Sequence, residues 1–141
     1  EVNNAVMLLV ENDKNELLVY NEYRHGIADI SYTFPAGGIE KNETLEETAK
    51  RELLEELGYE FSYFKLLKKY VVSGSYMFSE LNMISIKNIK KISEPQNKDI
   101  EDPDVMWLPK KEVKHCLLND NFKGLTYATA ALVWLLNNDE R

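Results

Sequence analysis

Residues 34–59 read FPAGGIEKNETLEETAKRELLEELGY and contain the best-defined element of the chain. Thr44 and Glu47 form a T-x-x-E capping box, in which the hydroxyl accepts a hydrogen bond from the N3 amide and the carboxylate accepts one from the cap amide. Gly58 stands where the end of a helix favours a left-handed residue. The stretch therefore predicts a helix from about Leu45 to Leu57.

Three glutamates lie on one side of this predicted helix. At roughly 100° per residue, Glu52, Glu55 and Glu56 fall within an arc of about 100° that borders the apolar stripe. Like charges three and four residues apart destabilise a helix by a few tenths of a kcal/mol, and partial burial adds the cost of lost hydration. A divalent cation such as Mg²⁺, which prefers oxygen ligands, would remove both costs. The alternative is a solvated acidic face with Lys50 and Arg51 as ion-pair partners.

The segment before the helix, Phe34-Pro35-Ala36-Gly37-Gly38, predicts a tight loop. Glycines let the backbone approach another group closely and adopt positive φ. Such a loop can direct carbonyl groups at a metal and amides at a phosphate. The alternative is a plain turn that ends a strand.

Taken together, the residues spell Gly37, five residues, Glu43, seven residues, and then RELLEELGY from Arg51 to Tyr59. This arrangement resembles the Nudix box, G-x5-E-x7-R-E-U-x-E-E-x-G-U, where U is aliphatic, and departs from it only at Tyr59. The resemblance implies an α+β fold, an α/β/α sandwich with a mixed β-sheet between helices. It also implies hydrolysis of a nucleoside diphosphate derivative, a small-molecule substrate, with Mg²⁺ or Mn²⁺ as cofactor.

Shorter stretches outside the box resemble the ADP-ribose pyrophosphatase branch of this family. They are Asn21-Glu22-Tyr23-Arg24, Phe34-Pro35-Ala36-Gly37, the acidic segment 99–102 with strand 105–108, and the helix over 123–132. The chain departs from that branch at Ser73-Gly74-Ser75, where a proline is missing. Members of that branch usually also carry a β-rich N-terminal extension, whereas the first strand expected here begins almost at once. These departures leave other nucleotide sugars and (d)NTPs open as substrates.

The resemblance assigns a role to each matching position. Glu52, Glu55 and Glu56 would be catalytic and would bind the metal together with the backbone carbonyl of Ala36. Glu80 matches a loop glutamate that is either a catalytic base or a ligand-positioning group, and its alternative is an ordinary exposed residue. Substrate binding is expected from Arg24, Gly37 and Gly38. Structural roles in the box are expected for Gly37, Glu43, Arg51 and Gly58.

The composition excludes several other classes of protein. The chain has 141 residues, 44% of them hydrophobic, which predicts one globular domain over residues 1–141. With 17 Lys and Arg against 24 Asp and Glu, its net charge of −7 argues against binding a nucleic acid polymer. Cys116 is the single cysteine, which excludes an internal disulfide and favours the cytoplasm. No apolar run reaches the roughly 20 residues of a membrane helix.

The remaining pattern alternates strands and helices. We predict a hairpin from Ala5–Val10 and Leu17–Tyr20, a strand over Ile30–Phe34, a second strand pair over Phe61–Val72 and Met77–Ile86, a loop over Glu94–Asp102 and a strand over Val105–Leu108. Helices are predicted over Lys110–Leu118 and Leu125–Asn137. The apolar stretch from Tyr127 to Leu136 is expected to pack on the sheet or to form a homodimer surface. Phe34, Trp107 and Cys116 are expected in the core, and His25 on a surface loop.

These patterns predict an Mg²⁺-dependent Nudix hydrolase, with ADP-ribose as the expected substrate and AMP and ribose 5-phosphate as products. A different class of protein, a silent Nudix module that senses a nucleotide, is the main alternative. It is disfavoured because Glu52, Glu55 and Glu56 are all present.

Overall fold

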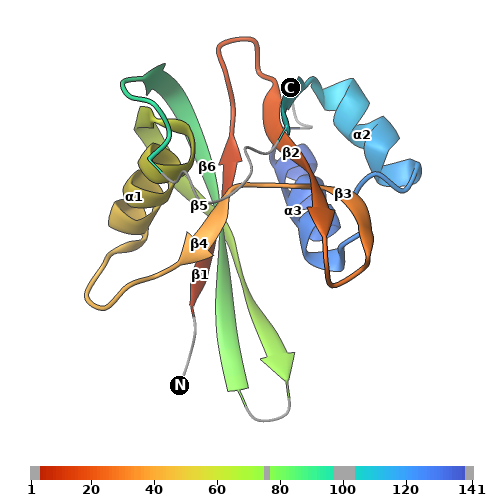
Figure 1. The fold of residues 1–141 in the computed structure, drawn as a ribbon, viewed down its shortest axis with the longest axis horizontal. Coiled ribbons are helices and arrows are strands. Elements are labelled where there is room, and N and C mark those ends of the chain that lie inside the picture. Colours follow the sequence, from red (N-terminus) through yellow and green to blue (C-terminus); the bar gives the residue numbers. More distant parts are fainter. Residues whose placement is uncertain (1–3, 75–76, 97–103, 139–141) are drawn as a thin grey trace.

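The computed structural model describes residues 4–74, 77–96 and 104–138 (Figure 1). Seven strands and three helices lie within these residues, so the predicted α+β class is confirmed. The strands are β1 (Ala5–Val10), β2 (Leu17–Arg24), β3 (Asp29–Thr33), β4 (Ala36–Gly38), β5 (Tyr59–Gly74), β6 (Met77–Lys91) and β7 (Asp104–Leu108). The helices are α1 (Leu45–Leu57), α2 (Lys110–Leu118) and α3 (Leu125–Asn138). In the described residues, no helix is long and apolar enough to cross a membrane.

The strands form two sheets, with strand orders β4-β1-β6-β5 and β3-β2-β7. The first sheet is mixed, because β1 runs parallel to β6 and antiparallel to β4. The long β5–β6 pair is antiparallel, as predicted, and its two connecting residues lie outside the described residues. The predicted loop at 94–102 falls largely outside them as well, since residues 97–103 are not described.

The predicted hairpin between Ala5–Val10 and Leu17–Tyr20 is wrong. β1 and β2 belong to different sheets, and only an isolated bridge between Glu11 and Leu17 joins them. Val6 to Val10 are at most 2% exposed, so β1 is buried on both faces and occupies a central place between β4 and β6. Asn12 makes the intervening turn, because its Oδ1 accepts hydrogen bonds from the backbone amides of residues 14 and 16.

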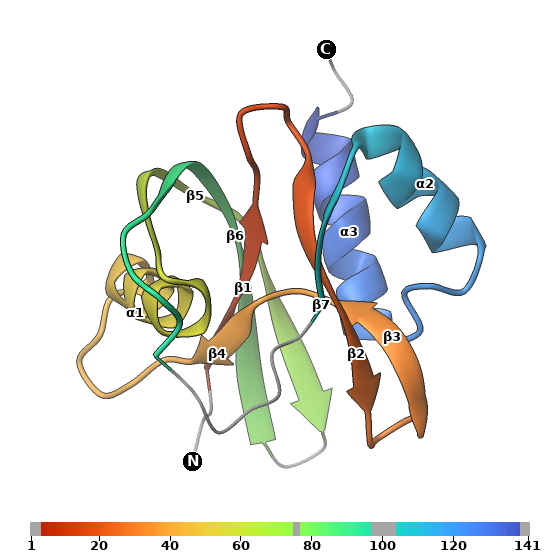
Figure 2. The same cartoon turned by 45° about the horizontal axis from the view of Figure 1, so that its top comes forward.

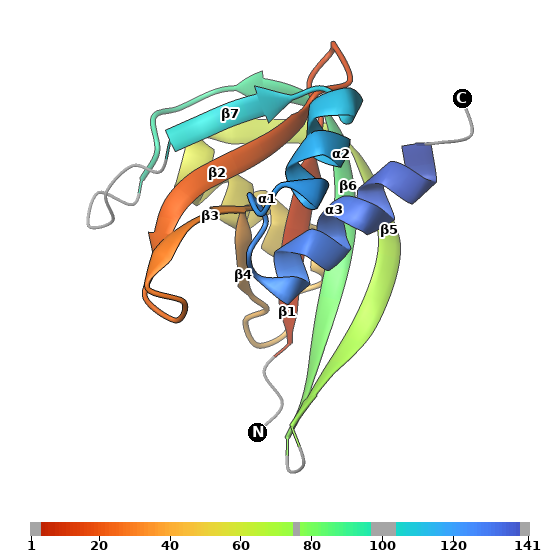
Figure 3. The ribbon, with the colours of Figure 1, turned by 90° about the vertical axis from the view of Figure 1, so that its right-hand side faces the viewer.

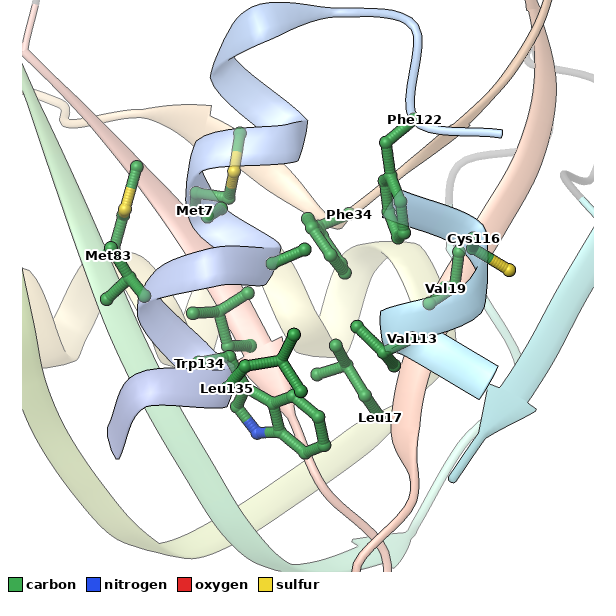
Figure 4. Packing of buried hydrophobic residues seen from close by; sticks show 14 of the residues in the cluster. Met7, Leu17, Val19, Phe34, Met83, Val113, Cys116, Phe122, Trp134 and Leu135 are labelled. Atoms are coloured by element: carbon green, nitrogen blue, oxygen red, sulfur yellow. The ribbon is translucent and has the colours of Figure 1, made fainter. Parts of the chain in front are cut away.

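Helices cover the sheets on opposite sides, which gives the expected three-layer arrangement (Figure 2). Alternate residues of β1 point into two separate cores. Val6, Leu8 and Val10 pack with Ala49 and Leu53 of α1. The intervening residues Met7 and Leu9 pack with residues of α2 and α3. Figure 3 shows these two helices on one side of the strands, and Figure 4 shows Met7 in this cluster.

The core predictions for individual side chains hold. Phe34 and Cys116 are buried in the core beside α2 and α3. Trp107 is half-buried against the core beneath α1. His25 is exposed in the turn between β2 and β3, as expected.

A buried carboxylate connects β1 to α3. Glu11 is only 2% exposed, and its Oε1 accepts a hydrogen bond of 3.0 Å from the indole N–H of Trp134. Its Oε2 lies 3.2 Å from Lys87 Nζ, an ion-pair distance without hydrogen-bond geometry. The indole is therefore an important donor to this charge.

Replacing Trp134 with Phe should lower the free energy of unfolding by about 1–3 kcal/mol, because a buried carboxylate oxygen loses its donor. Urea unfolding of Trp134→Phe measures the effect. Trp107→Phe is the matched control, since it makes the same change at a half-buried position. Equal costs for the two variants would contradict the proposed importance of the Trp134–Glu11 bond.

Candidate active site

Both ends of α1 are capped as the sequence predicts. Thr44 Oγ1 accepts a hydrogen bond of 3.1 Å from the Glu47 amide, and the Glu47 carboxylate accepts one from the Thr44 amide. Gly58 has φ 73° and donates to the carbonyl of Leu54. A Cβ at Gly58 would lie 1.8 Å from the carbonyl oxygen of Ser93, so the position requires glycine both for its conformation and for its space.

Arg51 organises the residues around the helix. Its guanidinium donates to both carboxylate oxygens of Glu43, at 2.8 and 2.9 Å, and to Glu52 Oε1 at 2.8 Å. The same group donates to the carbonyl of Gly38 at 2.9 Å. Arg51 thus connects α1, the preceding loop and β4, which fits the structural role expected of it and of Glu43.

The pKa values of these partners reflect this network. Hydrogen bonds from Arg51, helped by the backbone amide of Glu40, lower the pKa of Glu43 to about 2. The hydrogen bond to Glu43 raises the pKa of Arg51 above its already high ordinary value. Glu43 and Arg51 are therefore a permanent ion pair across the working pH range.

Gly37 lies against the Glu52 carboxylate. A Cβ at Gly37 would come 2.1 Å from the carboxyl carbon of Glu52, so a side chain there would displace this glutamate. The predicted tight loop is wrong for residues 36–38, which form the short strand β4, and among the described glycines only Gly58 has a positive φ. Close approach of the backbone, and not unusual φ, is what Gly37 provides.

The geometry of β4 leaves the Ala36 carbonyl directed away from β1. Leu8 donates to the carbonyl of Pro35 and Ile39 donates to that of Asn4, so alternate residues of this segment face β1. Ala36 and Gly38 are the residues between, and the Gly38 carbonyl meets Arg51. The Ala36 carbonyl therefore points to the same edge of β4 as the Gly38 carbonyl, which accepts a hydrogen bond from Arg51.

Glu56 is the least compensated of the three box carboxylates. Its Oε2 is buried and has no hydrogen-bond partner among the described residues. Burial, together with the nearby charges of Glu52, Glu22 and Glu55, raises its pKa to about 8. Burial also raises the pKa of Glu52, although the Arg51 hydrogen bond opposes this. Glu55 is more exposed and lies 3.6 Å from Arg51.

Sequence reasoning missed three residues that the fold brings to this group. Glu22 in β2 accepts a hydrogen bond from Thr33 at 2.9 Å, and its charge raises the pKa of Glu56. Tyr20, also in β2, and Tyr127, in α3, both have raised pKa values, chiefly through burial and partly through Glu22 and Glu56. No local pattern marks these residues, since their proximity to α1 depends on how the second sheet is placed.

Arg24 lies at the edge of a pocket of about 410 Å³. Its guanidinium is 3.3 Å from Glu22 and lies 5.4 Å from the centre of the Tyr127 ring. The pocket is formed by the β2–β3 turn and the start of α3, and its lining comprises Tyr23, Arg24, His25, Gly26, Ile27, Ser31, Gly124 and Tyr127. The charge of Glu56 contributes to the raised pKa of Tyr127, so this lining residue lies within electrostatic range of the box.

Glu80 lies in a strand where the resemblance implies a loop, and Gly38 contributes a backbone group. Glu80 lies within β6 and not in a loop, and its carboxylate is 3.7 Å from Lys69. Among the described residues, the charges that raise the pKa of Glu56 do not include Glu80. A Cβ at Gly38 would meet open space, so the contribution seen for Gly38 is its carbonyl group.

The residues present suit a hard cation only in part. Within the described residues, no three His, Cys, Asp or Glu side chains are gathered closely enough to hold a metal ion. Arg51 accounts for this, because it holds Glu52 directly and lies near Glu55. The unpartnered oxygen of Glu56 and the direction of the Ala36 carbonyl are the features that fit an oxygen-ligated ion such as Mg²⁺.

Comparison with known proteins finds relatives in sequence and in fold. Among curated proteins, the chain is 28% identical over 105 residues to the ADP compounds hydrolase NudE of Escherichia coli (strain K12), covering 74% of this chain and 56% of that protein. It is 29% identical over 87 residues to the methanol dehydrogenase activator of Bacillus methanolicus, covering 62% and 47% respectively. The chain thus spans about half the length of these relatives.

Solved structures with this fold include a crystal structure of an ADP compounds hydrolase, with a TM-score of 0.85 and 25% identity over 99% of this chain and 76% of the other. A NUDIX hydrolase from Nitrosomonas europaea gives a TM-score of 0.70 at 18% identity, covering 97% and 90%. The family model described as the NUDIX domain matches residues 2–139, a range that contains every site residue described above. The chain therefore belongs to the Nudix family.

Proposed function

We propose that the chain is an Mg²⁺-dependent hydrolase that cleaves the diphosphate linkage of a nucleoside diphosphate derivative, with ADP-ribose as the preferred substrate. Water and ADP-ribose would give AMP and ribose 5-phosphate. The observation that carries the proposal is the buried, unpartnered carboxylate oxygen of Glu56 within a complete Nudix box. An uncompensated buried carboxylate is costly, and a bound cation is a direct way to offset that cost.

Glu52, Glu56 and the Ala36 carbonyl are the groups that would hold the ion, with Glu55 beside them. A divalent cation there would offset phosphate charge and lower the pKa of a bound water. Arg51 would keep Glu52 in place through the 2.8 Å hydrogen bond. Glu55 is favoured over Glu80 as the group that accepts a proton from the attacking water, because it lies in the box while Glu80 lies beside Lys69.

The substrate side of the proposal rests on the pocket at Arg24. Its volume of about 410 Å³ is within the roughly 300–1,000 Å³ of small-molecule sites. Arg24 offers a cation for phosphate oxygens, and Tyr23 and Tyr127 offer aromatic walls for a sugar or base. The likeness to a protein named an ADP compounds hydrolase supports an adenosine diphosphate derivative. A net charge of −7 disfavours a more highly charged triphosphate.

Replacing Glu56 with Gln should lower Mg²⁺-dependent turnover on the order of 100-fold or more, because the cation loses a charged ligand. The fold should persist, since the change removes charge from a crowded buried site. Steady-state kinetics with ADP-ribose, alongside a melting curve, measure both effects. Glu46→Gln, at an exposed position in the first turn of α1, is the matched control. Wild-type turnover by Glu56→Gln would refute the role of Glu56.

Millimolar Mg²⁺ should raise the melting temperature, and more so at about pH 8.5 than at pH 6.5. The pKa of Glu56 is about 8 in the folded protein against an ordinary 4.5. Between these two pH values the folded protein keeps a proton that the unfolded chain has released. The free energy of unfolding without metal therefore falls as the pH rises from 4.5 to about 8. A cation that replaces the proton binds better as the pH rises. Thermal melts with and without Mg²⁺ at the two pH values test this. A shift independent of pH would contradict it.

Among candidate substrates, ADP-ribose should give the highest kcat/KM. The panel is ADP-ribose, ATP, 8-oxo-dGTP, a diadenosine polyphosphate and GDP-mannose, with products identified by chromatography. A tenfold preference corresponds to about 1.4 kcal/mol of transition-state stabilisation. A triphosphate that is preferred by this margin would refute ADP-ribose as the substrate, and binding without hydrolysis of any compound would indicate a sensing module.

A further inference from the structure

Tyr20 is a buried tyrosine in β2 whose hydroxyl has no role in the fold described so far. The residue is 4% exposed, and its hydroxyl has no hydrogen-bond partner among the described residues. Its side chain packs in the core beneath α1, together with Ala49 and Leu53 of that helix. An apolar ring would satisfy this packing equally well, so the hydroxyl requires another explanation.

The helix geometry brings that hydroxyl to the box carboxylates. Glu52 and Glu56 lie three and seven residues after Ala49, on the face of α1 that also contains Leu53. Tyr20, in the same core cluster as Ala49 and Leu53, therefore packs on the side of α1 that also holds Glu52 and Glu56. Glu22 lies two residues after Tyr20 and projects from the same face of β2.

The electrostatics agree with this placement. After burial, the causes that raise the pKa of Tyr20 are the charges of Glu56, Glu22 and Glu52, in that order. The charges of three carboxylates, two on α1 and one on β2, thus act on this one hydroxyl. Glu56 Oε2, an acceptor on the carboxylate that is the first of these charges, is also buried and has no partner among the described residues.

We propose that Tyr20 is a positioning residue of the box, whose hydroxyl donates a hydrogen bond to the ionised Glu56 carboxylate when that carboxylate binds a divalent cation. A carboxylate that uses one oxygen for a cation needs a donor for the other, and such outer partners orient metal ligands. A tyrosine hydroxyl can rotate to supply that donor and accepts as well as donates. The inference rests on the metal binding of the proposed function, and is independent of its substrate.

The test is Tyr20→Phe, with Mg²⁺ and Mn²⁺ binding measured by isothermal titration calorimetry in the absence of substrate. We expect the dissociation constant for the metal to rise roughly tenfold or more, the cost typical of losing an outer partner of a metal ligand. The melting temperature of the metal-free protein should stay the same or rise, since a buried hydroxyl without a partner is removed. A purely structural role would lower this melting temperature and leave metal affinity unchanged.

Tyr32→Phe is the matched control. The rings of Tyr32 and Phe122 pack edge-on with their centroids 5.6 Å apart, on the side of α2 and α3. Burial raises the pKa of Tyr32, and the charges that add to this are those of Cys116 and Glu112, not those of the box. Metal affinity in Tyr32→Phe should therefore equal that of the wild type.

Metal affinity within twofold of wild type in Tyr20→Phe would overturn the inference. So would a Tyr20→Phe protein that fails to fold, because the hydroxyl would then serve the metal-free fold. A wild-type protein that binds metal but does not hydrolyse ADP-ribose would refute the proposed substrate. The metal affinity of Tyr20→Phe would still decide the role of Tyr20. A wild-type protein that binds neither ion would overturn both.

Discussion

The hydrogen bonds of Arg51 are the interaction on which the site depends. Its guanidinium meets Glu43, Glu52 and the carbonyl of Gly38, so one side chain joins the helix α1 to β4 and to the segment between them. Exposed ion pairs contribute little, but Arg51 is half-buried and binds Glu43 through two parallel bonds, the geometry in which such pairs are strongest. Without it, Glu52 would face Glu55 and Glu56 with no nearby cation from the box.

This arrangement has a consequence for Glu56. Arg51 compensates Glu43 and Glu52 and lies near Glu55. Glu56, one helical turn after Glu52, has no such partner among the described residues. Burial then raises its pKa to about 8, and the metal-free fold keeps a proton or a poorly compensated charge there. An uncompensated charge destabilises the metal-free fold, and a bound cation would remove this cost. The protein is therefore expected to be less stable at the proposed cation site than a fully compensated site would be.

Local patterns predicted α1 well, since capping boxes, helix periodicity and the close spacing of the box act within a few residues. Thr44, Glu47 and Gly58 were all placed correctly because each acts on its own helix end. Strand pairing was less predictable. The turn at Asn12 looks like a hairpin, yet β1 is buried on both faces and pairs with residues 29 to 33 and 76 positions away in sequence. Tyr20, Glu22 and Tyr127 were missed for the same reason, because partners brought together by the fold leave no local pattern.

Because the strands form two sheets, the candidate site has two parts, the box and the pocket at Arg24. The box lies on α1 and β4, which pack with the sheet that contains β1. Arg24 and the pocket lie at the β2–β3 turn and the start of α3, with β2 and β3 in the other sheet. Side chains at the β2–β3 turn can therefore change without disturbing Arg51 or its partners, and under the proposed function this would let substrate choice vary while the carboxylates stay fixed. Tyr20 and Glu22 are the exceptions, since they reach the carboxylates from the second sheet, and changes there would affect both parts at once.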